Sequence, residues 1–175
     1  TQEGKTIFSI IIALFLVFAT ASIPLAAIYY PAPSFELKEA VENGANTSLD
    51  AVLKDKDTKG VMLYFMTTWW PACGQASPVV AKFDESYKKK GIRVIGILLT
   101  PADVKYMNEY KKKHNIKFPI LYGNIKIVEE YHIEHGVPAF FFIDKNGMVR
   151  KVLFGETTLE VMEELVDGAL KPVII

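Results

Sequence analysis

Apolar and polar residues divide the chain into a long apolar N-terminal run and a region where short apolar runs alternate with amphipathic stretches. The first run, Ile7–Tyr30, contains no charged residue. A helix that spans a bilayer needs about 20 apolar residues. The run therefore predicts a transmembrane segment, with Tyr29 and Tyr30 in the aromatic belt at one membrane surface.

The same run also resembles a secretory signal peptide, because Ala19-Thr20-Ala21 is a passable small-x-small cleavage site. However, the apolar run continues for nine residues beyond that site, which favours an uncleaved anchor. Lys5 precedes the run, so the rule that positive charge stays inside places the rest of the chain on the extracytoplasmic side. We expect a single-pass protein of the cell membrane.

The pattern after the run predicts a linker followed by one folded domain. Residues 1–30 are the predicted anchor, residues 31–47 a linker and lead-in, and residues 48–175 the domain. Pro31-Ala32-Pro33-Ser34 is typical of a stiff spacer. Ser48–Leu53 has the pattern of a short helical turn, capped by Thr47 or Ser48.

Within the domain, strand-like and helix-like patterns alternate and then give way to a hairpin. Ile92–Leu99 is almost wholly apolar, which indicates a strand buried on both faces of a helix-covered sheet. The predicted fold is therefore α/β, with three layers and a central mixed sheet. The other predicted elements are strands at Val61–Phe65, Phe118–Tyr122, Phe140–Ile143 and Met148–Phe154, and helices at Gln75–Lys90, Thr100–Lys113, Ile125–Tyr131 and Thr157–Leu170.

Several residues fit the ends of these elements. Gly91 suits the position after a helix, and Asn124 suits the cap before one. Thr100 followed by Pro101 indicates a helix start, and Thr157-Thr158-Leu159-Glu160 forms a capping box. Gly147 closes a predicted hairpin turn where positive φ is needed.

Charge and cysteine content narrow the possible functions. The chain has 20 Lys and Arg against 20 Asp and Glu, so no basic excess favours a nucleic-acid partner. Its single cysteine excludes an internal disulfide and a zinc site built on two or four cysteines. One thiolate with His114, His132 or His135 would also make a poor copper site. We expect no metal and no cofactor, and we interpret Lys88–Lys90 and Lys111–Lys113 as solvated cations at helix ends.

That cysteine, Cys73, lies where the strand Val61–Phe65 gives way to a helix. The turn there resembles the active-site turn of membrane-anchored thiol–disulfide oxidoreductases of the TlpA/ResA type, which have the thioredoxin fold. Those proteins carry W-C-x-x-C, with a proline five residues after the second cysteine. The matching residues here are Trp69, Pro71, Ala72, Cys73 and Pro78.

The first cysteine of that motif is absent, because Trp70 stands in its place. A second signature, Val137-Pro138, resembles the cis-proline loop that faces this turn in thioredoxin folds. The resemblance covers about Ser48 to Leu170 and implies disulfide exchange on exported proteins, including cytochrome maturation. It also implies partners that carry thiols or disulfides, and a membrane protein that donates electrons.

In such proteins the first cysteine attacks the substrate disulfide and the second resolves the mixed disulfide. Cys73 corresponds to the second, so three accounts stay open. Trp70 replaces a natural cysteine, or the protein works with one cysteine through mixed disulfides or another protein's thiol, or it only binds. A tryptophan is an unusual inactivating replacement, which favours a natural variant. A peroxide-reducing site would need threonine three residues before the reactive cysteine, where Trp70 stands.

The competing function is a redox-inert module that binds peptides or acts like a chaperone. The residues expected to bind substrate are the same in both cases: Trp69, Trp70, Pro71, Ala72, Val137 and Pro138. Trp70 either presents an apolar face beside Pro138 or folds back onto the domain. For Cys73, the predicted catalytic residue, the helix N-terminus lowers the pKa and burial raises it. No Lys, Arg or His lies within four residues, so we expect burial to win.

Overall fold

The computed structural model describes residues 29–170, and the predicted span before Tyr29 lies outside them. The described residues form a six-stranded sheet in the order β1-β8-β7-β4-β5-β6. Strands β4, β5 and β6 are parallel, and β7 and β8 run antiparallel to their neighbours. The mixed sheet confirms the predicted fold class. The strands are β1 (Tyr30–Pro31), β4 (Gly60–Met66), β5 (Ile92–Leu98), β6 (Ile120–Tyr122), β7 (Ala139–Asp144) and β8 (Met148–Phe154).

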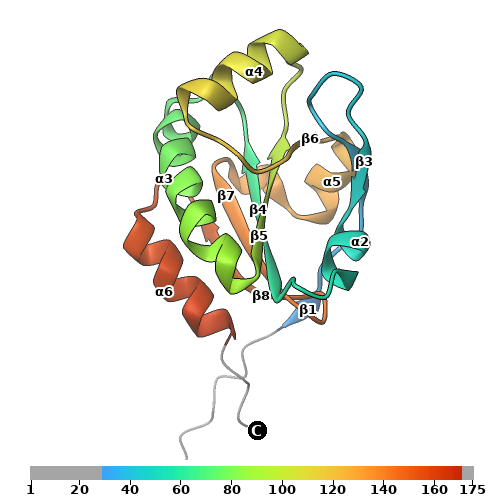
Figure 1. Cartoon of the computed structure of the whole chain (residues 1–175), viewed down its shortest axis with the longest axis vertical. Coiled ribbons are helices and arrows are strands. Elements are labelled where there is room, and N and C mark those ends of the chain that lie inside the picture. Colours follow the sequence, from blue (N-terminus) through green and yellow to red (C-terminus); the bar gives the residue numbers. More distant parts are fainter. Residues whose placement is uncertain (1–28, 171–175) are drawn as a thin grey trace, which may run out of the picture.

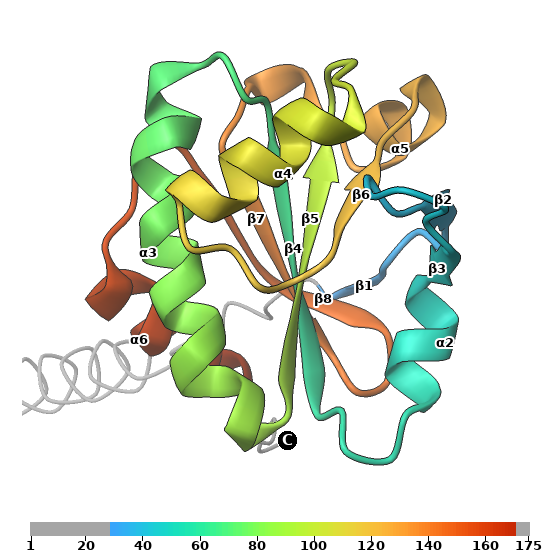
Figure 2. The same ribbon diagram turned by 45° about the horizontal axis from the view of Figure 1, so that its top comes forward.

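Helices cover both faces of this sheet (Figure 1). Helices α3 (Pro71–Tyr87) and α6 (Leu159–Leu170) pack on one face, and α2 (Leu49–Lys54) and α5 (Ile125–Glu130) lie on the other. Helix α4 (Val104–Lys113) crosses the end of the sheet where β4 runs into α3 (Figure 2). Short 3-10 turns, η2 (Lys88–Lys90) and η3 (Ile133–His135), complete the set.

Strand β4 explains why the central strands are continuous apolar runs. All seven of its residues are buried, because alternate side chains enter the two cores on either side of the sheet. Met62, Tyr64 and Met66 enter the core under α3. Val61, Leu63 and Phe65 enter the core under α2 and α5.

The predicted helix boundaries need three corrections. Helix α3 begins at Pro71, four residues before the predicted start at Gln75, because proline suits the first helical position. Helix α4 begins at Val104 with Asp103 as its cap: the Asp103 carboxylate accepts a 2.7 Å hydrogen bond from the Tyr106 amide. The N-cap of α6 is Thr158, one residue after the predicted Thr157, because the Thr158 hydroxyl accepts a hydrogen bond from the Val161 amide.

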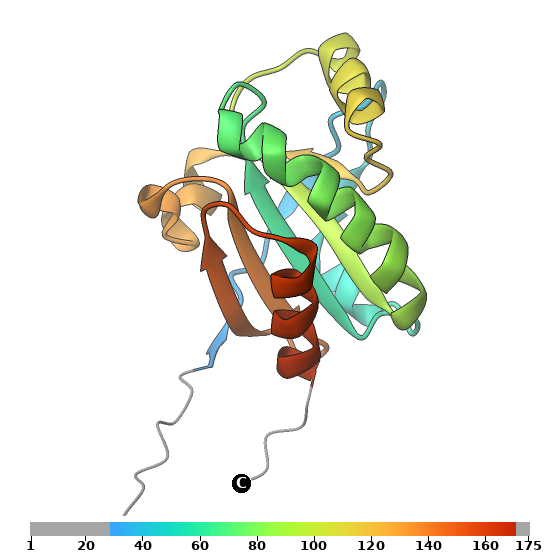
Figure 3. The same ribbon diagram turned by 90° about the vertical axis from the view of Figure 1, so that its left-hand side faces the viewer.

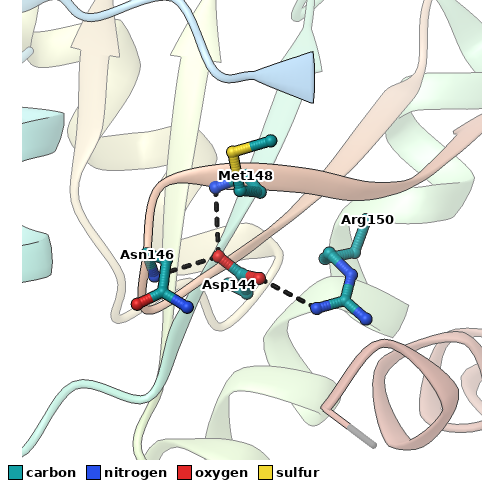
Figure 4. A network of polar contacts seen from close by, with 4 residues as sticks. All are labelled: Asp144, Asn146, Met148 and Arg150. Atoms are coloured by element: carbon teal, nitrogen blue, oxygen red, sulfur yellow. Dashed lines mark hydrogen bonds and ion pairs between the residues drawn. The ribbon is translucent and has the colours of Figure 1, made fainter. Parts of the chain in front are cut away.

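Other predicted ends are confirmed. Gly91 has φ of +92° after η2, Gly147 has φ of +77° in the hairpin, and the Asn124 side chain caps α5. Ser48, rather than Thr47, caps α2. In the hairpin between β7 and β8, the Asp144 carboxylate accepts from the amides of Asn146 and Met148 and pairs with Arg150 at 2.9 Å (Figure 4).

Residues 31–47, predicted as linker and lead-in, pack against the domain. Strands β2 (Glu36–Lys38) and β3 (Asn46–Ser48) form a hairpin, and Leu37 within β2 and Ala40 just after it are buried. The Ala40 amide donates to the Ile120 carbonyl at 2.7 Å. Tyr30, which the sequence pattern places in the span, lies in β1 and pairs with Val149 of β8. Among residues 29–170, no helix has the length and apolar character of a membrane span.

Candidate functional site

The candidate site lies at the turn where β4 ends and α3 begins. Trp70 has extended backbone, with φ of −78° and ψ of 124°, and serves as the N-cap of α3 without a side-chain hydrogen bond. Pro71 occupies the start of the helix, and Cys73 lies in its first turn. At this turn Trp70 faces solvent, whereas Cys73, three residues later, is buried.

Cys73 is a free thiol with no exposed surface. Burial raises the pKa of the Cys73 thiol, and Thr67 and the Tyr64 hydroxyl lower it by less. The Thr67 hydroxyl lies beside the thiol but has no hydrogen-bond partner of ordinary geometry among the described residues. Burial thus outweighs these hydrogen bonds, and the raised pKa expected from the sequence favours the protonated thiol near neutral pH.

A buried chain of hydroxyl groups supports this turn from below. The Tyr64 hydroxyl donates to the Cys73 carbonyl at 3.0 Å and lies 3.1 Å from the Ser77 hydroxyl. Ser77 in turn lies 2.9 Å from the Tyr110 hydroxyl on α4. Burial raises the pKa of both tyrosines above the ordinary phenol range, so both hydroxyls keep their protons and act as donors.

Sequence reasoning missed Tyr64, Ser77 and Tyr110 as part of the site. The available signal was polar side chains inside apolar patterns: Tyr64 within an apolar strand, and Ser77 on the helix directly before Pro78. Buried hydroxyls of this kind need partners. The contact between α3 and α4 that supplies the third hydroxyl is tertiary and has no mark in the sequence.

Trp69 and Trp70 lie on the opposite side of the turn, facing solvent. Their side chains are 66% and 45% exposed, and the rings meet edge to face with centroids 5.6 Å apart. Large exposed aromatic groups are uncommon on a folded domain, and clustered ones mark interaction sites. Of the two orientations left open for Trp70, the structure shows the exposed one.

Two hollows flank this tryptophan pair. One, of about 390 Å³, lies between the pair and the loop before β7 and is lined by Trp69, Trp70, His135, Gly136, Val137 and Gly155. The other, of about 550 Å³, lies between the pair and α4, and its lining includes Pro71, Tyr106, Glu109 and Lys113. Together they form an open, mostly apolar surface at the end of the sheet.

The cis peptide bond predicted from the family resemblance is present at Val137-Pro138. Pro138 itself is buried, and its carbonyl accepts from the Gly155 amide at 2.8 Å. Val137 therefore provides the loop's surface in the hollow, and Pro138 lies behind it. Ala72 is half-buried and lines neither hollow.

The predicted binding residues thus do not all meet at one place. Trp69, Trp70 and Val137 come together, whereas Pro71 faces the hollow beside α4. The three histidines do not form a metal site among the described residues. His132 and His135 are exposed, and burial together with Lys113 lowers the pKa of His114. Within residues 29–170 no group of three metal-ligating side chains gathers.

Comparison with known proteins gives consistent matches. The model of the AhpC/TSA family matches residues 28–152. The thiol-disulfide oxidoreductase ResA of Bacillus thuringiensis is 29% identical over 167 residues, which cover 93% of this chain and 95% of that protein. ResA of Oceanobacillus iheyensis is 26% identical and covers 75% of this chain and 67% of its own length.

Solved structures agree on the fold. A thiol:disulfide interchange protein of Chlorobium tepidum has a TM-score of 0.69 at 24% identity and covers 83% of this chain and 99% of its own. StoA of Bacillus subtilis has a TM-score of 0.60 at 22% identity, covering 79% of this chain and 98% of its own. At these identities the structural matches bear on the thioredoxin-like fold alone.

Proposed function

The chain belongs to the AhpC/TSA family, and from that premise we propose that it is a ResA-type protein for thiol–disulfide handling of exported polypeptides. Its similarity to ResA along 93% of the chain supports this role. The site contributes the hollow lined by Trp69, Trp70 and Val137, which we call the groove, and a cysteine at a helix N-terminus. In this chain, disulfide exchange itself is impaired.

The observation that carries this proposal is the isolation of Cys73. Its side chain has no exposed surface, and the 175 residues contain no second cysteine. Attack of the Cys73 thiolate on a substrate disulfide would form one S–S bond, break another and release a substrate thiolate. A second thiol must then break the mixed disulfide, and only an external protein or small thiol can supply it.

The groove supports a role in binding the substrate polypeptide. Exposed tryptophans offer large apolar contact area at low entropic cost, and such residues carry much of the energy of protein interfaces. Trp69, Trp70 and Val137 would contact the segment around the substrate cysteine. In this proposal Cys73 remains the one reactive group, and its burial slows its reaction with substrate.

The proposed location is the extracytoplasmic side of the cell membrane, with the uncharged run before Tyr29 as the anchor. The uncharged run and the preceding Lys5 support this orientation. Exported proteins meet an oxidising environment, where disulfides form and must be corrected. A membrane protein that donates electrons, and a role in cytochrome maturation, belong to the same proposal.

Insulin reduction tests the proposal directly. The full chain in detergent is compared with its Trp70→Cys variant, with dithiothreitol as the electron source. We expect the parent chain to match the dithiothreitol background and the variant to accelerate reduction. If the parent chain also accelerates reduction, Cys73 works alone and the impairment is refuted. If neither protein does, the match of this turn to the ResA type is refuted.

A second candidate function is a redox-inert module that binds unfolded peptide, and the exposure of both tryptophans favours it. The two candidates differ in their dependence on substrate cysteine. Because Trp69 and Trp70 are the only tryptophans, their fluorescence reports on this surface. Matched peptides with cysteine or serine at one position separate the two: equal affinity supports the inert module, and preference for cysteine supports thiol handling.

A further inference from the structure

A third hollow lies at the opposite end of the sheet from the tryptophan pair, beside the first half of β5. It has a volume of about 520 Å³, with α2 and β3 on one side and the end of α3 on the other (Figure 2). Strand β1 borders β8 at the far edge of the sheet, away from this hollow (Figure 3). We call this third hollow the edge hollow, and its lining includes Thr58, Asp84, Lys88, Arg93, Val94 and Lys117.

Strand β5 offers main-chain groups to the edge hollow, because β6 pairs only with residues 96–98. The Gly96 amide donates to the Pro119 carbonyl at 2.9 Å. Backbone groups of successive strand residues point to alternate sides, so the N–H and C=O of Val94 point the same way as those of Gly96. Among residues 29–170 no backbone group pairs with Val94 on that side. One donor and one acceptor of the main chain therefore face the edge hollow.

Asp84, on α3, is a buried acid that no neighbouring cation pairs with in the described part of the chain. Only 5% of the residue is exposed. Lys117 pairs instead with Glu85 at 2.6 Å, and Arg93 donates to the Lys88 carbonyl at 3.1 Å. Burial raises the pKa of the Asp84 carboxyl, and these three nearby cations lower it by less. A buried carboxylate without a direct partner is costly, so its place in the lining of a hollow points to a ligand.

Thr58, in the loop between α2 and β4, is a second buried polar group in the same lining. It is 1% exposed, and its hydroxyl oxygen has no hydrogen-bond partner among the described residues. Buried polar groups usually have partners, and here two without them border one hollow. Apolar side chains complete the lining, with Val52, Ile95 and Phe118 among them.

We propose that the edge hollow binds a free α-amino acid with an apolar side chain. Such a molecule carries an ammonium and a carboxylate on one carbon atom, which suits a carboxylate placed among cations. The ammonium group donates to the Asp84 carboxylate and to the Val94 carbonyl. The ligand carboxylate accepts from the Val94 amide, the Thr58 hydroxyl and the Arg93 guanidinium. The ligand side chain packs against apolar residues such as Phe118.

The charges of the lining favour a ligand that carries both signs. Three acidic and three basic side chains border the edge hollow: Glu36, Asp55, Asp84, Lys88, Arg93 and Lys117. A simple anion would approach a buried carboxylate, and a simple cation would approach three basic groups. The edge hollow shares no lining residue with the groove, so this inference does not rest on the proposed thiol–disulfide function.

Calorimetry with three related probes tests the ligand class. The full chain in detergent is titrated with L-leucine, with N-acetyl-leucine, which lacks the ammonium charge, and with leucinamide, which lacks the carboxylate. We expect saturable one-to-one binding of leucine, and binding of each blocked form weaker by at least about tenfold, because each loses charge-assisted hydrogen bonds. Equal affinity for either blocked form would overturn the proposal and leave a site for a simple anion or cation. Absence of saturable binding by all three would overturn it as well.

Asp84→Asn separates a binding role from a structural one. If the carboxylate only shapes the domain, its replacement by an amide of the same size leaves leucine binding unchanged. In the proposed site the change weakens leucine binding by at least about tenfold, while urea unfolding shows a stability equal to or above that of the parent, because a buried charge is removed. Glu164→Gln on α6 is the matched control: it removes the same charge outside the lining and should leave leucine binding unchanged.

Thr58→Val keeps the test decisive if Asp84→Asn does not fold. Valine has nearly the shape of threonine and removes only the unpaired hydroxyl, so the domain should keep its stability. We expect leucine to bind roughly threefold to tenfold more weakly, the effect of one lost hydrogen bond. Unchanged leucine affinity in Thr58→Val, or in a folded Asp84→Asn, would overturn the assignment of the edge hollow as an amino-acid site.

Discussion

The two sides of the first turn of α3 differ sharply. On the solvent side, Trp69 and Trp70 are 66% and 45% exposed, whereas Cys73, three residues further on, has no exposed surface. Trp70 precedes the helix as its N-cap, with its side chain on the solvent side, whereas Cys73 in the first turn packs into the core. The solvent side keeps a surface suited to recognition, and the buried side keeps a thiol that substrate cannot reach without movement.

A C-x-x-C turn combines substrate binding with thiol chemistry, and in this turn the two are separated. In the ResA-type motif the exposed position before Pro71 holds the attacking cysteine. Here an aromatic ring occupies that position, while the buried hydroxyl chain through Tyr64 and Ser77 still supports the turn. Binding and chemistry can therefore be changed separately, and the following variants do so in order of expected effect.

Trp70→Cys should change the chemistry most, because it creates Cys-Pro-Ala-Cys at an intact turn. The four-residue spacing brings the two sulfur atoms within disulfide geometry. We expect the variant to lose both free thiols on mild oxidation, measured by mass spectrometry after alkylation. Two free thiols that persist after oxidation would show that position 70 does not face Cys73.

Trp70→Ala should weaken polypeptide binding with little effect on folding. Removal of a central aromatic contact typically costs about 2 kcal/mol, or roughly 30-fold in affinity. Because the ring is 45% exposed, the free energy of unfolding should change by less than about 1 kcal/mol. Calorimetry with an unfolded peptide and urea unfolding measure the two effects, with Ile125→Ala as an exposed control that lines neither hollow beside the tryptophans.

An equal loss of binding in the Ile125 control would show that the tryptophan pair is not the docking surface. A large loss of folding stability in Trp70→Ala would show that the ring supports the domain instead. Either result would remove the distinction between the two sides of the turn.

Tyr64→Phe should affect only the buried side. The change removes the hydroxyl that donates to the Cys73 carbonyl and contacts Ser77. Loss of a buried hydrogen bond costs about 1–2 kcal/mol, which urea unfolding can measure. Tyr110→Phe, at the outer end of the same chain, is the matched variant and should cost less. Peptide affinity should stay unchanged, and a parallel loss of affinity would couple the two sides.

The regular parts of the fold could be predicted because their signals are local. Val61–Phe65 and Ile92–Leu99 are apolar runs that only a sheet covered on both faces accommodates, and Gly91 and Asn124 mark helix ends through backbone chemistry. The start of α3 is marked only by Pro71 at the first helical position, because its N-cap is Trp70, a residue without a capping side chain.

Competing signals explain the error at α4. Thr100 followed by Pro101 and then Asp103 offers two possible caps, and the carboxylate of Asp103 takes the role. Strands β1, β2 and β3 were missed because each has only two or three residues and depends on contacts with distant parts of the chain. Tertiary contacts determine such short strands, and the local sequence pattern carries no signal of those contacts.

The candidate site was likewise predictable only where its signals are local in the sequence. The position of Cys73 and the loop at Val137-Pro138 followed from sequence signatures. The orientation of Trp70 and the hydroxyl chain to Tyr110 depend on how α3, α4 and the loop before β7 pack together. Residues 69–73 alone carry no information on that packing.

Burial keeps Cys73 protonated and slow to react, and the pH dependence of its alkylation measures this property. Burial raises the pKa of the thiol, so the reactive thiolate forms only as pH rises above the ordinary range for cysteine. The full chain in detergent is treated with iodoacetamide across a pH series, with the unfolded chain in urea as the reference. We expect a slow reaction at pH 7 that accelerates only in the alkaline range. A fast reaction in the folded protein, with a midpoint near or below neutral pH, would contradict the account and identify Cys73 as a working nucleophile.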